Sequence, residues 1–159
     1  LCYNGIRHYS IININDFQES LQLRNKDNDI VSGFEKYRSS SLTDDEMVDL
    51  FEEIKKLFDY EEIYLEPQLK IDKISRQLNV TSHKVSQTIN TKANKSFYDF
   101  VNQYRVEYFK KSLSNPENRK FTILALGIES GFNSKATLNR IFKQNTGMTP
   151  KEFQQKSIS

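Results

Sequence analysis

The sequence predicts an all-α fold in which two units of paired short helices are joined by a longer helix. From residue 44 onward, apolar residues recur at steps of three and four, which is the spacing of one helix face, and no convincing strand pattern is present. Only five Gly and three Pro occur among 159 residues, which argues against a β-rich chain full of tight turns. A third observation is an internal repeat within residues 70–159.

Residues 1–42 show no sustained period and are expected to form an irregular arm or linker. Asn, Asp, Ser and Gly interrupt this segment, and one short helix at about residues 17–23 is the element it favours. The arm closes with the run Ser39-Ser40-Ser41. The following domain is expected to span residues 43–156.

The first strong helix is predicted over residues 44–59. Thr43 can cap its N-terminus, and Glu46 three residues later completes a capping box. Asp44 and Asp45 then lie in the first turn, where the helix dipole favours negative charge. Its apolar face is expected to consist of Met47, Leu50, Phe51, Ile54, Leu57 and Phe58.

From Leu69 onward the pattern predicts a series of further helices. A longer one, over about 97–113, is opened by Ser96 and stopped by Asn115-Pro116. One apolar face is expected along it, made of Phe97, Phe100, Val101, Tyr104, Tyr108 and Leu113. Thr122 is the expected N-cap of the helix that follows.

The basic half repeats its own pattern at an offset of about 52 residues. A small residue, Ser75 or Gly127, allows a second helix to approach the first closely. Four positions later, Asn79 or Gly131 can take the left-handed conformation that ends a helix. Capping side chains then start the second helices: Thr81 in one copy, and Asn133 or Ser134 in the other. The repeat therefore predicts two helix-turn-helix subdomains, at about 71–91 and 122–144, joined by a long linker helix.

The second copy also carries a family signature. Three stretches resemble the signature of AraC/XylS-type transcription regulators: Thr122-Ile123-Leu124-Ala125-Leu126-Gly127-Ile128-Glu129-Ser130-Gly131-Phe132-Asn133-Ser134, Asn139-Arg140-Ile141-Phe142-Lys143, and Gly147-Met148-Thr149-Pro150-Lys151-Glu152-Phe153. The resemblance covers about residues 47–155 and implies two helix-turn-helix units with a linker helix at about 97–113. Three residues depart from it: Ser75 and Gly127 stand where Ala is usual, and Leu138 where Phe is usual.

The resemblance implies double-stranded DNA as the partner, no cofactor and a cytoplasmic location, with RNA polymerase as a candidate further partner. The run Lys36-Tyr37-Arg38-Ser39-Ser40-Ser41-Leu42 resembles the junction in a subgroup of these regulators. In that subgroup an N-terminal multi-helix membrane segment precedes a cytosolic DNA-binding part. The full-length protein would then be membrane-anchored, with an N-terminal sensor or membrane region ahead of Leu1.

Charge is divided unevenly along the chain. Residues 1–69 carry 7 Lys/Arg and 15 Asp/Glu, and residues 70–159 carry 16 and 6, so the net charges are −8 and +10. Such a division favours a nucleic-acid-binding half. The single cysteine, Cys2, excludes a disulfide framework and a zinc site with two or more Cys. No phosphate-binding loop, metal-ligand spacing or nucleophile motif is present, so we expect no catalytic residue, no metal site and no enzyme.

The second helix of each unit must present polar side chains opposite its buried stripe. The stripe is expected to be Val85 and Ile89 in the first unit, and Leu138, Ile141 and Phe142 in the second. The candidate DNA-binding residues are then His83, Lys84, Ser86, Gln87 and Asn90 in the first unit, and Lys135, Thr137, Asn139, Arg140 and Lys143 in the second.

By resemblance, Lys135, Asn139 and Arg140 are the base-reading residues of the second unit. Gln can pair with adenine bidentately, and Arg with guanine is the commonest specific contact. Lys143, with Lys92 and Lys95 of the first unit, is expected to meet phosphates, which position the protein without specifying a sequence.

These features favour a sequence-specific transcription regulator whose two recognition helices enter successive major-groove segments about 34 Å apart. The alternative is a helical protein-interaction module that uses the N-terminal arm and the acidic helix 44–59. Such a module has no need of a net charge of +10 on its scaffold. An RNA-binding helical domain is disfavoured, because the sequence lacks the aromatic platforms that such modules use.

Overall fold

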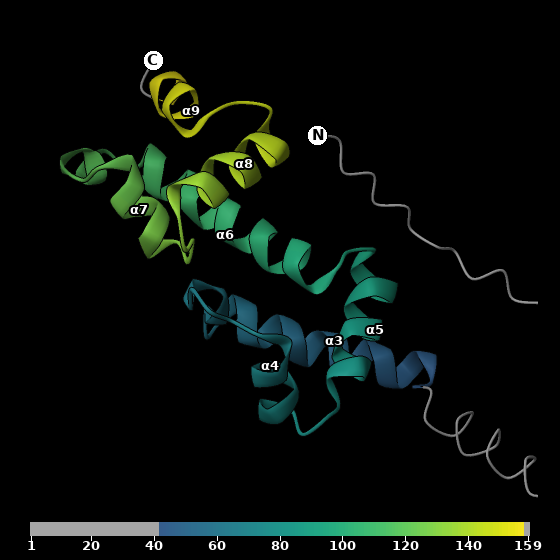
Figure 1. The fold of residues 1–159 in the computed structure, drawn as a ribbon. Coiled ribbons are helices and arrows are strands. Elements are labelled where there is room, and N and C mark those ends of the chain that lie inside the picture. Colours follow the sequence, from purple (N-terminus) through teal and green to yellow (C-terminus); the bar gives the residue numbers. More distant parts are fainter. Residues whose placement is uncertain (1–41, 158–159) are drawn as a thin grey trace, which may run out of the picture. The chain divides into compact units, whose positions relative to one another are not determined.

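The computed structural model describes residues 42–157, and every regular element in this part of the chain is helical (Figure 1). In chain order these elements are α3 (Asp44–Asp59), the 3-10 helix η2 (Ile63–Leu65), α4 (Ile71–Gln77), α5 (Ser82–Ala93), α6 (Phe97–Ser114), the 3-10 helix η3 (Pro116–Lys120), α7 (Ile123–Glu129), α8 (Lys135–Thr146) and α9 (Pro150–Lys156). The chain divides into two units, Leu1–Ser41 and Leu42–Ser159. The predicted irregular arm, with its short helix at about 17–23, lies outside the described residues.

Side-chain caps fix where the helices begin. The Thr43 hydroxyl accepts a hydrogen bond from the Glu46 N–H at 3.3 Å, and the Glu46 carboxylate accepts one from the Thr43 N–H at 2.8 Å. The predicted capping box and the predicted helix over 44–59 are thereby confirmed. The Thr122 hydroxyl caps α7 in the same way, accepting from the Ala125 N–H at 3.1 Å.

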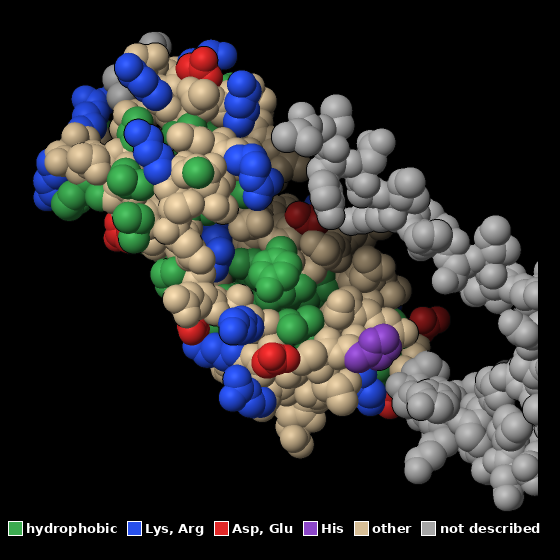
Figure 2. All heavy atoms as spheres, viewed as in Figure 1, with side chains coloured by type: hydrophobic (Ala, Val, Ile, Leu, Met, Phe, Trp, Pro, Cys, Tyr) green, Lys and Arg blue, Asp and Glu red, His purple; other side chains and the backbone are tan. Residues whose placement is uncertain are grey.

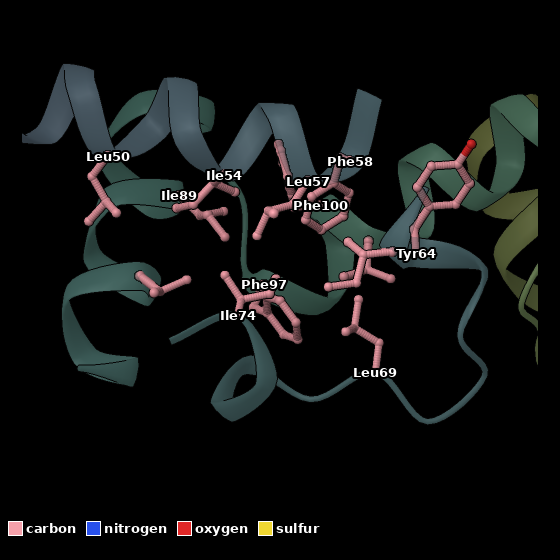
Figure 3. Packing of buried hydrophobic residues seen from close by; sticks show 13 residues of the cluster. Leu50, Ile54, Leu57, Phe58, Tyr64, Leu69, Ile74, Ile89, Phe97 and Phe100 are labelled. Atoms are coloured by element: carbon pink, nitrogen blue, oxygen red, sulfur yellow. The ribbon is translucent and has the colours of Figure 1, made fainter. Parts of the chain in front are cut away.

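The first hydrophobic core lies between α3, α4, α5 and the N-terminal half of α6. Figure 3 shows Leu50, Ile54 and Leu57 of α3 pointing toward Ile74 and Ile89. Aromatic rings extend this core along α6, where Phe58 and Phe100 meet edge to face with ring centroids 4.9 Å apart. Because α3 and α4 both pack against α5, one face of α5 is completely buried.

A second core lies between the C-terminal half of α6 and the helices α7, α8 and α9. Phe109 of α6 and Phe142 of α8 are fully buried and meet edge to face at a centroid separation of 5.3 Å. Phe153 of α9 covers the other side of Phe142 at 5.5 Å. Each helix-turn-helix pair therefore has a core of its own, and α6 contributes to both.

The expectation of one apolar face along α6 is wrong. Phe97, Phe100 and Val101 are buried in the first core, with Tyr104 and Tyr108 half-buried against it. Three other residues are buried in the second core: Val106, Phe109 and Leu113. Successive helix residues are about 100° apart, so these two stripes lie roughly 150° apart around the axis. A single stripe cannot serve two cores that lie on different sides of the same helix.

Arg105 joins the two halves of the fold. Its side chain donates from Nε to the Tyr64 carbonyl at 2.7 Å and from Nη2 to the Glu66 carbonyl at 2.7 Å. Burial lowers the pKa of Arg105 from its ordinary value, but an arginine stays charged in proteins, so these are charge-assisted hydrogen bonds. Gly131 lies against the same contact, because a Cβ there would meet Tyr64 O at 2.6 Å and Arg105 Nε at 2.8 Å.

Candidate nucleic-acid interface

The turn of the first helix-turn-helix unit connects α4 to α5. Asn79 takes the left-handed conformation, with a φ of 52°, as predicted. The Val80 N–H then donates to the Ser75 carbonyl at 2.9 Å, which turns the chain sharply. The Thr81 hydroxyl accepts from the Lys84 N–H at 3.3 Å and starts α5.

The second unit repeats this turn with the same hydrogen bonds. Gly131 is left-handed, with a φ of 89°, and the Phe132 N–H donates to the Gly127 carbonyl at 3.1 Å. The Ser134 hydroxyl accepts from the Thr137 N–H at 3.2 Å and starts α8, which decides between the two predicted caps. The repeat seen in the sequence is therefore a repeat of backbone geometry.

Close helix contact in the second unit depends on Gly127. A Cβ at this position would lie 2.4 Å from Cδ2 of Leu138, so the leucine side chain occupies the space that an alanine would need. Leu138 is only 1% exposed. The two departures from the family pattern at these positions are therefore a matched pair in this fold.

In the first unit, α5 has a buried face and a polar face. Val85 and Ile89 are fully buried, as predicted, and Thr88 is buried beside them. Of the candidate DNA-binding residues on this helix, three are exposed and two are half-buried: His83, Ser86 and Asn90, and Lys84 and Gln87. The structure thus brings these candidates to one side of α5.

Lys84 is also close to the start of α3. Hydrogen bonds from the Thr43 backbone and hydroxyl hold the pKa of Glu46 below its ordinary value, and the charge of Lys84 lowers it further. Part of the positive potential of Lys84 is therefore balanced by a carboxylate of its own chain.

In the second unit, Leu138, Ile141 and Phe142 of α8 are buried, as predicted. Four candidate residues are exposed on the other side: Lys135, Asn139, Arg140 and Lys143. The remaining candidate, Thr137, is half-buried, and its hydroxyl lies 3.1 Å from that of Ser134 within the helix cap.

Two amides extend these polar faces beyond the residues selected from the sequence. Gln144 follows Arg140 by four residues and continues the same face of α8, whereas Asn94 is the left-handed C-cap directly after α5. Both are exposed. The helical spacing from Arg140 is the sequence signal that indicates Gln144.

Figure 2 shows Lys and Arg side chains over both subdomains, with many of them around α7, α8 and α9. Within residues 42–157, no group of three or more His, Cys, Asp or Glu side chains could hold a metal ion. Among the same residues, no helix is both long and apolar enough to cross a membrane.

Known protein families resemble this chain. A family model described as a helix-turn-helix domain matches residues 74–156, which is more than half of the 159 residues. The chain belongs to the AraC-type helix-turn-helix family. This family consists of DNA-binding transcription regulators and is not an enzyme class.

Curated relatives are named as HTH-type transcriptional regulators. An uncharacterized HTH-type transcriptional regulator of Staphylococcus aureus strain COL is 26% identical over 102 residues, which is 64% of this chain and 13% of that protein. The regulator of strain MRSA252 has the same identity and coverage. The chain therefore matches only a small part of the length of these relatives.

Solved structures share the fold. A protein of unknown function from Listeria innocua is 24% identical with a TM-score of 0.56, covering 65% of this chain and 95% of that one. The C-terminal domain of the two-component response regulator yesN from Fusobacterium nucleatum is 23% identical with a TM-score of 0.56, covering 64% and 98%. An AraC-type regulator from Chromobacterium violaceum is 16% identical with a TM-score of 0.51, covering 56% and 77%.

Proposed function

We propose that this AraC-type chain is a sequence-specific transcription regulator that reads two major-groove segments of double-stranded DNA with α5 and α8. The observation that carries the proposal is the repeated turn, since the bond from Val80 to Ser75 recurs from Phe132 to Gly127. Each turn is followed by a helix with one buried face and one polar face. A recognition helix in the major groove has the same division, with a buried face against its own domain and a polar face toward the bases.

The roles of the polar residues follow from their chemistry. On α5, Gln87 can pair with adenine, and His83 and Ser86 can reach acceptors or phosphates nearby. On α8, Lys135, Asn139 and Arg140 would read bases. Lys84 would also reach into the groove, Asn90 would lie nearer its edge, and Thr137 would face the DNA from α8. Lys92, Lys95 and Lys143 would meet phosphates.

Two recognition helices in one chain would bind successive groove segments about 34 Å apart and read a site without two-fold symmetry. We further propose that the chain acts in the cytoplasm, has no catalytic activity and needs no cofactor. From the resemblance, we also propose RNA polymerase as a partner. The resemblance likewise leads us to propose an N-terminal sensor or membrane region in the full-length protein.

A salt titration of duplex binding tests this function against the alternative of a protein-interaction module. If the basic half neutralises about six phosphates, a plot of log affinity against log salt should have a slope near −5. The net charge of +10 in residues 70–159 provides enough cations for this. A flat slope, or no duplex binding at low salt, would contradict the proposal and favour the interaction module.

A further inference from the structure

A polar cleft lies where the two recognition helices approach the linker helix. It has a volume of about 370 Å³ and is lined by the C-terminal ends of α5 and α8 and the first turns of α6. Figure 1 shows α6 running from the end of α5 toward α8. Because residues of both α5 and α8 line the cleft, it lies between the two units. Amide side chains dominate its wall, contributed by all three helices: Asn90, Asn94, Asn102, Gln103, Gln144 and Asn145.

Most of these amide side chains have no hydrogen-bond partner among the residues that the structure describes. The Asn145 side chain donates to the Ile141 carbonyl at 2.8 Å, but the side chains of Asn90, Asn102 and Gln144 make no hydrogen bond to another described residue. Amides elsewhere are used within the fold; for example, the Asn118 amide donates to the Ser112 carbonyl at 3.1 Å. The cleft therefore presents a concentration of unused donors and acceptors to a ligand.

The cleft continues the polar faces of both recognition helices. Asn90 lies four residues after Ser86 on α5, and Gln144 lies four residues after Arg140 on α8, so the two faces converge on it. When two helices enter successive major-groove segments on one side of B-DNA, the minor groove between those segments faces the protein. A wall of side chains at this point would meet that groove.

The wall of the cleft carries balanced charge and many amides, which can both donate and accept hydrogen bonds. Its wall contains one cation, Lys95, and one anion, Asp99, and the Asp99 carboxylate accepts a hydrogen bond from the Ser96 hydroxyl at 2.6 Å. Lys and Arg contact phosphates, as do polar side chains, which can only donate to them, whereas the minor groove offers both acceptors and the guanine 2-amino donor. Asn and Gln can satisfy either kind, and minor-groove proteins use them for this purpose.

We propose that this amide cleft binds the DNA minor groove between the two major-groove segments and gives the protein a preference for the base pairs there. The inference rests on the proposed function, because it requires that α5 and α8 both bind duplex DNA. Asn102 and Gln144 would make the principal contacts, one from the linker helix and one from the second recognition helix. The DNA-binding surface would then be continuous from α5 to α8, with base-contacting side chains at its centre.

The test compares central base pairs in a duplex that the wild-type chain has enriched from a random library. Central G·C pairs are replaced by inosine·C pairs, which remove only the minor-groove 2-amino group, and by A·T pairs. The variants are Gln144→Ala, whose side chain is exposed, and the double variant Asn102→Ala with Gln144→Ala. Gln68→Ala, an exposed amide outside the cleft, is the matched control.

We expect Gln144→Ala to weaken binding about fivefold, the value of one hydrogen bond. The wild type and Gln68→Ala should distinguish G·C from inosine·C at the centre by a similar factor, and the double variant should not distinguish them. Equal loss on every central sequence would mean contact with the sugar-phosphate backbone and overturn the inference, as would unchanged affinity in both variants. If Arg140→Ala still weakens binding in that case, the proposed function stands; if the wild type binds no duplex, the proposed function has failed.

Discussion

Replacing Gly131 with Ala should destabilise the fold far more than replacing the other left-handed glycine, Gly147. Both residues have positive φ, 89° and 76°, so both substitutions incur the left-handed penalty of about 1–2 kcal/mol. Their surroundings differ. A Cβ at Gly131 would lie 2.6 Å from the Tyr64 carbonyl oxygen and 2.8 Å from Arg105 Nε, whereas a Cβ at Gly147 would meet nothing within 4 Å.

The extra cost at Gly131 comes from the Arg105 contact. Neither a backbone carbonyl nor a buried guanidinium can move away freely, so the substitution should displace the bond from Arg105 to Tyr64. A hydrogen bond to a charged group is worth about 1.5–3 kcal/mol. We therefore expect Gly131→Ala to lower the free energy of unfolding by about 3–5 kcal/mol, and Gly147→Ala by about 1–2 kcal/mol.

Urea unfolding followed by circular dichroism measures both values, and asparagine separates the two causes. Asn tolerates the left-handed conformation, so Gly147→Asn should recover most of the stability lost in Gly147→Ala. Gly131→Asn should recover little, because its Cβ meets the same carbonyl. Equal destabilisation at the two glycines, or full recovery by Gly131→Asn, would refute the steric argument and the role of Arg105 as the joint between the units.

The two further predictions concern the second unit. Arg140→Ala should cost about 1–3 kcal/mol on the preferred duplex and relax the preference at one base pair, whereas Lys143→Ala should weaken all duplexes together and lower the salt slope by about one. Competition binding with cognate and scrambled DNA measures this, and equal weakening on both DNAs by Arg140→Ala would make that residue a positioning contact. Gly127→Ala should destabilise the fold by about 1–2 kcal/mol, because its Cβ would lie 2.4 Å from a methyl group of the buried Leu138. In a Leu138→Ala background the same change should instead stabilise by about 1 kcal/mol, from helix propensity alone, and a thermodynamic cycle without coupling would contradict the matched-pair explanation.

The sequence by itself determined the helices and the turns, because these depend on contacts within a few residues. The Thr43 and Glu46 capping box and the Thr122 cap are interactions between a side chain and its nearby backbone, and the left-handed Asn79 is the conformation of a single residue. The buried stripes of α5 and α8 were also predictable, since each helix packs against one core and a single period describes it.

Only the tertiary structure decided how the linker helix serves two cores. Val106 and Phe109 break the stripe that Phe97 and Tyr104 begin, and the reason becomes visible only when α7 and α8 lie on the other side of α6. Arg105 is buried because two carbonyls some forty residues away accept its hydrogen bonds, and no local pattern indicates them. The amide cleft likewise needs three helices to meet before its side chains become neighbours. Contacts between distant residues depend on how helices pack, and helical periodicity specifies a buried face without naming its partner.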